Sequence, residues 1–155
     1  HGNHLVKKAT DDMVGTQKPA VCVDCHSAET DDKGFMVAGE MKKLIDSLKT
    51  KDSQTKVILD EAGQKGMDVS DATFSLKDVR QMLIQSRTTI HAFNLDKFKE
   101  QIGEGFTIVN KAKISGEEAI DEFYYRRIGL GISTILVTLL VIGLYIKLKK
   151  VEKKS

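Results

Sequence analysis

Proline and cysteine are scarce in this chain of 155 residues, and its charge is nearly balanced. A single proline argues against a loop-rich or polyproline design and favours helices. Two cysteines are too few for a disulfide-dense scaffold or for a four-cysteine zinc site. A formal net charge of +2 gives no support for nucleic-acid binding from bulk charge. With 41% hydrophobic and 30% charged residues, the composition fits neither a disordered chain nor an all-membrane protein.

The charges that are present are distributed unevenly along the chain. Residues 1–127 carry 19 Lys/Arg and 21 Asp/Glu, residues 128–146 carry none, and residues 147–155 carry five Lys and one Glu. The basic isoelectric point therefore comes from a short tail, while the main part of the chain is nearly neutral. So sharp a change of composition marks a physical boundary.

The uncharged stretch Ile128–Ile146 predicts a transmembrane helix. At 1.5 Å per residue, a helix of this length spans roughly the 30 Å hydrocarbon core of a bilayer. The alternative is a buried helix of a globular core, but such helices are usually shorter and carry a polar stripe. Tyr124, Tyr125 and Tyr145 lie where interfacial aromatic residues are expected.

The flanks of this stretch predict its orientation. Five lysines follow it, whereas Arg126 and Arg127 on the other side are accompanied by acidic residues. The positive-inside rule then predicts a single-pass protein of the cytoplasmic membrane, with a cytoplasmic C-terminus and a periplasmic or extracellular N-terminal part. Because the sequence starts at His1 without a hydrophobic leader, we expect that a signal peptide was removed or that the chain was cut further upstream.

The sequence Cys22-Val23-Asp24-Cys25-His26 is a C-x-x-C-H motif, the attachment sequence for c-type haem. Two thiols one helical turn apart can each add to one vinyl group of the same porphyrin. The histidine that follows is then placed under the iron as its proximal ligand. The chain has one such motif, so we predict one covalent haem c held by Cys22, Cys25 and His26.

Three other interpretations of the motif compete. A structural disulfide is possible, although a spacer of two residues is typical of a redox-active bridge. A thioredoxin-like site would need a strand before the motif and a helix after it, and no such pattern surrounds it. A zinc site would need further ligands, and the adjacent Cys25 and His26 do not readily face one tetrahedral metal.

His91 is the predicted distal ligand of the iron. It follows a predicted amphipathic helix and lies one turn beyond Arg87, so both side chains can face one site, where Arg87 could pair with a haem propionate. The haem that His91 ligates could also belong to a neighbouring subunit. The alternative is that His91 ends a helix and binds no metal. The other candidates for the distal position are His1, His4, Met13, Met36, Met41, Met67 and Met82.

The two segments CVDCH and SRTTIHAFN precede a capped helix with the sequence Tyr-Tyr-Arg-Arg and the apolar stretch. In this order they resemble the membrane-anchored cytochromes c of respiratory chains. They are also similar to the tail region of multihaem cytochromes, in which a histidine after a helix caps a haem bound upstream. This chain differs from the multihaem families in having one C-x-x-C-H motif.

The fold class predicted is all-α, with a small helical cytochrome c-like domain and one C-terminal transmembrane helix. Apolar spacing predicts helices over about 39–50, 54–63 with Ser53 as cap, 71 or 75 to 89, and 95–102 ended by Gly103. Residues 103–114 are predicted to be a linker with some extended character. A capping box at Ser115 predicts an uninterrupted helix to about Lys150. The predicted regions are a haem-binding domain 1–114, a pre-membrane helix 115–127, the span 128–146 and a cytoplasmic tail 147–155.

These observations favour an electron-relaying subunit over a catalyst with its own substrate site. The expected partners are the lipid bilayer, other redox proteins and further subunits of a respiratory or photosynthetic oxidoreductase, with no nucleic acid. Two other functions stay open: a haem sensor with five-coordinate iron, and a structural anchor for a membrane complex.

Overall fold

The structure is a computed structural model that describes residues 10–30, 33–92 and 94–153, apart from the side chains of Thr30 and His91. Over these ranges the chain is all-α, as predicted, and contains no strand. Three long helices carry the fold: α1 (Lys33–Gln64), α2 (Ser70–Thr89) and α3 (Leu95–Glu152). Four single 3₁₀ turns accompany them: η1 (Asp11–Met13), η2 (Cys22–Asp24), η3 (Ala28–Thr30) and η4 (Ile90–Ala92).

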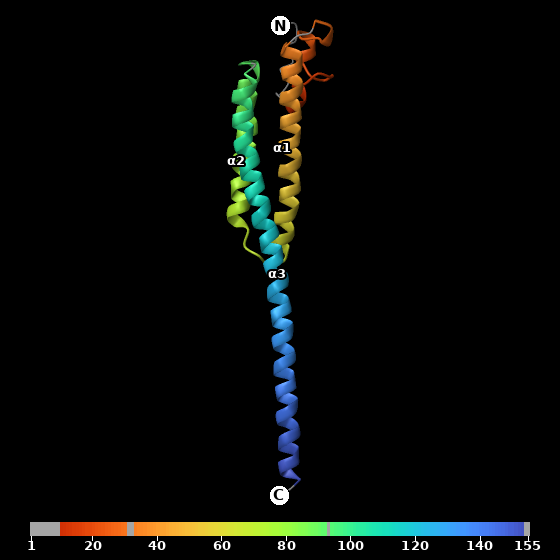
Figure 1. The fold of residues 1–155 in the computed structure, drawn as a ribbon, viewed down its shortest axis with the longest axis vertical. Helices are drawn as coiled ribbons and strands as arrows, with labels where there is room; N and C mark the ends of the chain where they lie inside the picture. Colours follow the sequence, from red (N-terminus) through yellow and green to blue (C-terminus); the bar gives the residue numbers. More distant parts are fainter. Residues whose placement is uncertain (1–9, 31–32, 93, 154–155) are drawn as a thin grey trace, which may run out of the picture.

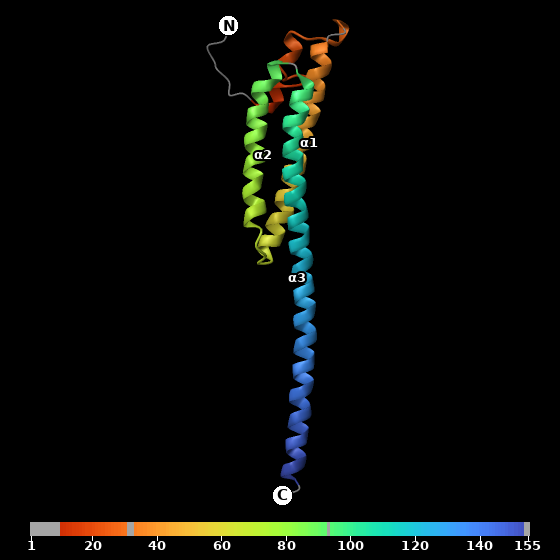
Figure 2. The same cartoon turned by 60° about the vertical axis from the view of Figure 1, so that its left-hand side comes forward.

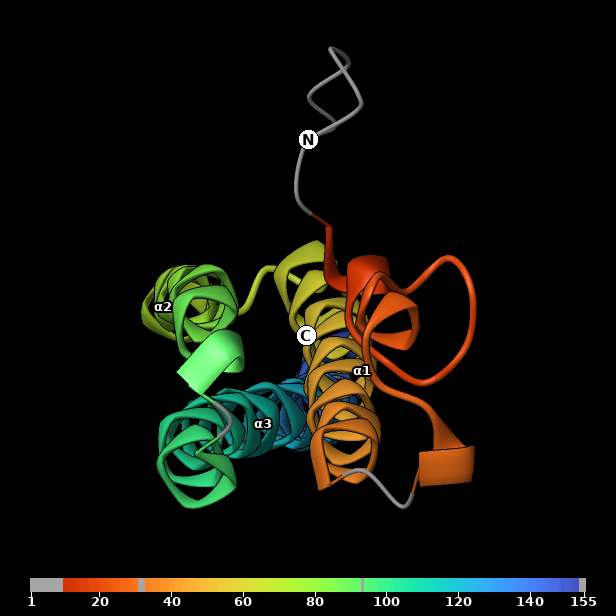
Figure 3. The ribbon, with the colours of Figure 1, turned by 90° about the horizontal axis from the view of Figure 1, so that it is seen from above.

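The helices α1 and α3 run parallel to each other. The helix α2 runs antiparallel to both, from the end of α1 back to the start of α3 (Figures 1 and 2). Two close approaches define the register of the parallel pair: Leu48 lies against Gly105 and Leu59 against Gly116, so the partners are 57 positions apart in both cases. Seen along the bundle, α2 lies beside α3 and stands apart from α1 (Figure 3).

Apolar residues at helical spacing bury one stripe on each helix. Their burial is the dominant stabilising contribution to such a bundle. The largest fully buried apolar side chains are Met41, Ile45, Leu48, Val79, Phe98, Ile102 and Val109.

The predicted interruption near Ser53 is wrong, since α1 continues through it to Gln64. Ser53 is exposed on the helix surface, where a serine costs little. The buried stripe passes from Leu48 to Leu59 without a break, and Asp52 pairs with Lys56 one turn on at 2.5 Å. A continuous buried stripe therefore outweighs the capping preference of one serine.

The predicted end of a helix at Gly103 and the predicted linker 103–114 are also wrong, because α3 is helical throughout. The reason lies in Gly105 and Gly116, both buried against α1. A Cβ atom at Gly105 would lie 2.8 Å from the Leu48 side chain, and one at Gly116 would lie 2.9 Å from that of Ile58. These glycines allow close helix contact instead of breaking the helix.

The helix predicted from residue 71 or 75 to 89 is confirmed as α2. The helix after Ser115 is uninterrupted as predicted, but its predicted start with a capping box at Ser115 is wrong, because Ser115 lies inside α3, which begins at Leu95 with Asn94 as its cap. The predicted boundary at residue 114 falls within α3, between the buried Ala112 and Gly116. The bundle and the apolar stretch are thus joined by unbroken helix and not by a linker.

Beyond Tyr125, α3 projects alone from the bundle (Figures 1 and 2). Among the described residues it is the one helix long and apolar enough to cross a membrane, and no part of its apolar window is buried. This exposure contradicts the alternative of a buried globular core helix, since the apolar side chains from Ile128 to Ile146 have no protein neighbours to bury them.

Candidate functional site

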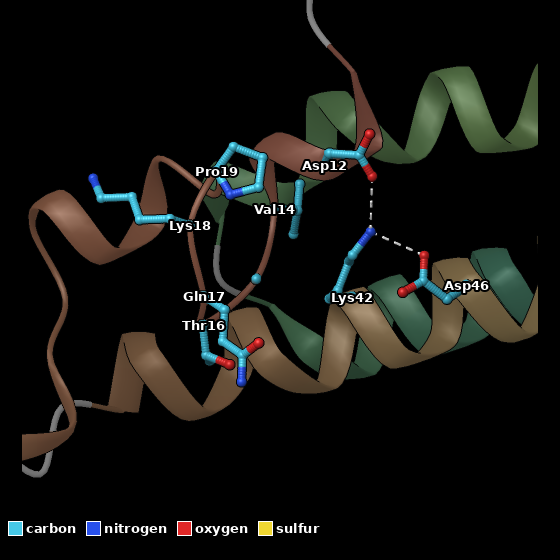
Figure 4. Close-up of a pocket in the computed structure, with 9 residues that line it drawn as sticks. Asp12, Val14, Thr16, Gln17, Lys18, Pro19, Lys42 and Asp46 are labelled. Atoms are coloured by element: carbon cyan, nitrogen blue, oxygen red, sulfur yellow. Dashed lines mark hydrogen bonds and ion pairs between the residues drawn. The ribbon is translucent and has the colours of Figure 1, made fainter.

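The segment that carries the C-x-x-C-H motif folds back along the first half of α1. Lys42 of α1 pairs with Asp12 at 3.3 Å and with Asp46 at 3.0 Å (Figure 4). Gly15, at a φ of 135°, lets the chain turn closely over Lys42, whose Cγ would lie 3.3 Å from an added Cβ. The segment that leads into the motif therefore lies beside the first half of α1 and not at the far end of the bundle.

A cavity of about 320 Å³ lies between this segment and α1. Figure 4 shows Lys42 reaching across it towards the two carboxylates, while the Lys18 side chain points away. Its lining comes from the loop before the motif and from α1: Asp12, Val14, Gly15, Thr16, Gln17, Lys18, Pro19, Lys42 and Asp46. None of the three motif residues with ligand chemistry lines this cavity.

The motif itself forms a single helical turn. The Cys25 amide donates to the Cys22 carbonyl at 3.2 Å, and the His26 amide donates to the same carbonyl at 2.9 Å. A hydrogen bond from the Val21 amide to the Met13 carbonyl at 2.9 Å holds the start of this turn against η1. The Cys22 thiol lies 3.7 Å from that carbonyl, so Cys22 faces η1.

No disulfide joins Cys22 and Cys25. Cys25 is exposed, whereas Cys22 and His26 are half-buried. Within residues 10–30, 33–92 and 94–153 no strand precedes the motif, and no three His, Cys, Asp or Glu side chains form a group that could hold a metal ion. The helical turn and the two thiols fit a covalently attached porphyrin, which Cys22, Cys25 and His26 would hold and which would supply one-electron redox chemistry.

Arg87 contacts the carboxylate of Asp11 in η1. Its Nε donates to Asp11 Oδ1 at 2.8 Å, and Lys49 Nζ lies 3.2 Å from Asp11 Oδ2. The Asp11 side chain is only 8% exposed. Burial raises the pKa of this carboxyl, but the hydrogen bonds and charges of Arg87 and Lys49 outweigh burial and hold the pKa below its usual range. Pairing of Arg87 with a propionate stays a prediction.

The Asp11 contact joins three elements, η1, α1 and α2, and fastens the motif-bearing segment to the bundle. Sequence reasoning missed it, because 76 positions separate Asp11 from Arg87 and nothing distinguishes Asp11 from its neighbour Asp12 in the sequence. This ion pair fixes the position of the turn Asp11–Met13, and the Cys22 thiol contacts the Met13 carbonyl of that turn.

His91 lies in η4, between the end of α2 and the start of α3, and its side chain is outside the described part of the structure. The 57-position register of the parallel helices places Leu95, the first residue of α3, level with Ala38 in the first part of α1. The motif and η4 therefore lie at the same end of the bundle, away from the apolar half of α3 (Figures 2 and 3). Ligation by His91 stays a prediction.

The other candidates for the distal position are scattered. Met41 is fully buried in the core, as its place on an apolar face predicts, and Met36 is 63% exposed at the start of α1. Met67 lies in the turn after α1, at the opposite end of the bundle from the motif. Met82 is half-buried on α2, and Met13 is half-buried in η1, where its carbonyl faces Cys22. His1 and His4 lie outside the described residues.

Comparisons of the chain with protein-family models, with curated proteins and with solved structures gave no match.

Proposed function

We propose that this chain is a membrane-anchored monohaem cytochrome c that relays electrons on the outer side of the cytoplasmic membrane. Cys22 and Cys25 hold the porphyrin, His26 is the proximal ligand and His91 is the distal ligand. The chemistry that the haem supplies is the transfer of one electron at a time by its iron. The chain's own residues hold, orient and support that group, and it acts as one subunit of a larger oxidoreductase.

The observation that carries the proposal is the turn Cys22–His26. Hydrogen bonds from the Cys25 and His26 amides to the Cys22 carbonyl place the three residues that a c-type haem needs on one helical turn. Both thiols are unpaired, and the exposed Cys25 leaves room for a bulky group on the outside of the segment. Asp24, between the two cysteines, pairs with Lys18 and so ties the turn to the loop before it.

The membrane anchor is supported by the exposed apolar half of α3. Five lysines follow this half, whereas Arg126 and Arg127 directly precede it, so the tail is the more basic flank. By the positive-inside rule, this asymmetry favours a cytoplasmic tail and a bundle on the outer side. A covalently held haem suits that side, because thioether bonds prevent its loss to the surroundings.

The test is whether haem stays attached to the polypeptide. The chain is produced in cells that mature c-type cytochromes, with an export signal, and the purified protein is extracted with acidic acetone. We expect the colour to remain with the wild type and with the matched variant Val23→Ala, whose half-buried side chain lies in the same turn but has no ligand chemistry. The double variant Cys22→Ser/Cys25→Ser is expected to lose it. Colourless wild-type protein would contradict the proposal.

The distal ligand has a separate test. If His91 ligates the iron, His91→Ala is expected to change the low-spin visible spectrum and to open the iron to carbon monoxide, while the haem stays covalently bound. An unchanged low-spin spectrum would show that another group fills the position. Carbon monoxide binding to the reduced wild type without denaturant would favour the five-coordinate sensor instead.

A further inference from the structure

The parallel pair α1 and α3 places the motif far from the apolar half of α3. The segment before the motif contacts α1 at Lys42, which the 57-position register puts level with Lys99 of α3. From Lys99 to Ile128, where the apolar stretch begins, α3 is unbroken. At 1.5 Å per residue this length of helix is about 44 Å.

The opposite end of the bundle lies at the start of the apolar stretch. Lys65, just after α1, places its ammonium 5.7 Å from the centre of the Tyr124 ring and 5.8 Å from that of Phe123. These aromatic residues lie one turn before Ile128. The part of α1 from Lys42 to its end therefore stands between the bilayer side of the bundle and the contact with the segment before the motif, which agrees with the estimate along α3.

This spacing is stiff. Two helices support each other over most of the distance, with close contacts at Gly105 and Gly116 and a fully buried stripe that includes Leu48 and Val109. Tilting of membrane helices reaches about 40°, which would still leave the motif about 30 Å above the start of the apolar stretch. Bending would have to separate the packed pair.

We infer that the redox partner of this chain presents its cofactor in the aqueous phase, at the membrane-distal end of the bundle, and not within the bilayer. This rests on the proposed function. Electronic coupling through protein falls exponentially with distance, so a quinol confined to the bilayer is too remote for direct exchange with haem at Cys22 and Cys25. The partner is a one-electron redox protein: it loses one electron as the ferric haem becomes ferrous, or gains one in the reverse direction, and no atom is transferred.

The position of the haem is tested first, in the holoprotein reconstituted into vesicles. Both native thiols are used in the thioether bonds, so an engineered cysteine is the one free thiol for a fluorescent dye. Lys43→Cys places the dye at an exposed site of α1, next to Lys42, which contacts the segment before the motif, and Tyr125→Cys places it at an 80% exposed site beside the apolar stretch. We expect energy transfer to the haem to abolish most emission at position 43 and little at position 125. Equal loss at both sites would overturn the inference.

Electron transfer is tested with two donors that share one ring chemistry. Reduced methyl viologen is soluble, whereas reduced dihexadecyl viologen is anchored in the bilayer. In dilute vesicles we expect the soluble donor to reduce the haem at once, and the anchored donor to fail until a catalytic amount of soluble viologen is added. Reduction at equal rates by both donors would overturn the inference.

These experiments distinguish a failure of this inference from a failure of the proposed function. If no haem is attached, neither dye loses emission by energy transfer and no haem spectrum changes with either donor, which refutes the proposed function itself. If haem is attached but lies near the bilayer, the protein is coloured, the dye at position 125 is quenched and the anchored donor works. That second result refutes only the inference about the partner.

Discussion

The two halves of α3 belong to one helix but follow different rules. In the first half, Phe98, Ile102 and Val109 are buried at helical spacing, and Gly105 and Gly116 allow close contact with α1. In the second half the apolar residues cover every face, and a Cβ atom at Gly129, Gly131 or Gly143 would meet nothing within 4 Å. An apolar stripe indicates a protein neighbour, whereas an apolar surface all round indicates a lipid one.

The largest expected difference between the halves concerns a buried aromatic side chain. Phe98→Ala removes a fully buried ring, and we expect it to lower the free energy of unfolding of the bundle by about 3–5 kcal/mol. Leu139→Ala, at a residue 60% exposed in the second half, should leave bundle unfolding unchanged. Thermal unfolding followed by circular dichroism in detergent measures both. Equal losses would mean that the apolar half packs on the bundle.

A charge in the middle of the apolar stretch should affect the second half of α3 and not the first. Val137→Arg is expected to disfavour membrane insertion by about 2.5–3.5 kcal/mol, while leaving bundle unfolding unchanged. Thr107→Arg, at an exposed position of the first half, is the control and should insert normally. Resistance to alkaline extraction from membranes is the measurement. Normal insertion of both variants would argue against a span.

The ion pair of Asp11 with Arg87 and Lys49 fastens η1 to the bundle. It should give the stability of the bundle a pH dependence that the apolar half of α3 does not share. The pKa of Asp11 is lower in the folded state, so its contribution is present above the ordinary value of 3.8 and is lost as the pH falls through the folded value. Asp11→Asn is expected to cost about 1.5–3 kcal/mol at neutral pH, as for a hydrogen bond to a charged group, and to flatten this acid dependence.

Urea unfolding between neutral and acidic pH measures the effect, with the exposed Asp60→Asn as control. The apolar half has no ionisable Asp, Glu, Lys or Arg between Ile128 and Ile146, so membrane insertion should not share the acid dependence of the bundle. If Asp11→Asn kept the full acid dependence of the wild type, Asp11 would not be the group responsible.

The smallest expected effect comes from the glycines. At Gly116 a Val side chain would crowd Ile58 and Leu59, and we expect a cost of about 1–3 kcal/mol in bundle stability. Gly131→Val is the matched change in the second half, where no neighbour lies within 4 Å, and it should leave the unfolding transition in place. A stable Gly116→Val bundle would show that α1 and α3 can separate without cost.

Long apolar patterns were predictable from the sequence, and interruptions were not. The helix over α2 follows from apolar periodicity, whereas the run from Ser115 was predicted from a capping box and the uncharged stretch after it. Ser53, Gly103 and Gly105 were interpreted as breaks because their local propensities favour helix ends. At Gly105 the reason is a residue of a distant segment, because Leu48 of α1 packs against it. Ser53 is exposed and Gly103 has no neighbour within 4 Å, so the packing of the residues around them keeps these positions helical.

The sequence alone determined the chemistry available to this protein, because the motif from Cys22 to His26 and the uncharged stretch Ile128–Ile146 are local patterns that need no partner to be read. Only the tertiary structure decided how these two features are related in space. Parallel packing of α1 on α3 sets the distance between them, and the contact of Asp11 with Arg87 and Lys49 holds the motif's segment in place. Both depend on contacts between residues far apart in the chain, which no local pattern encodes.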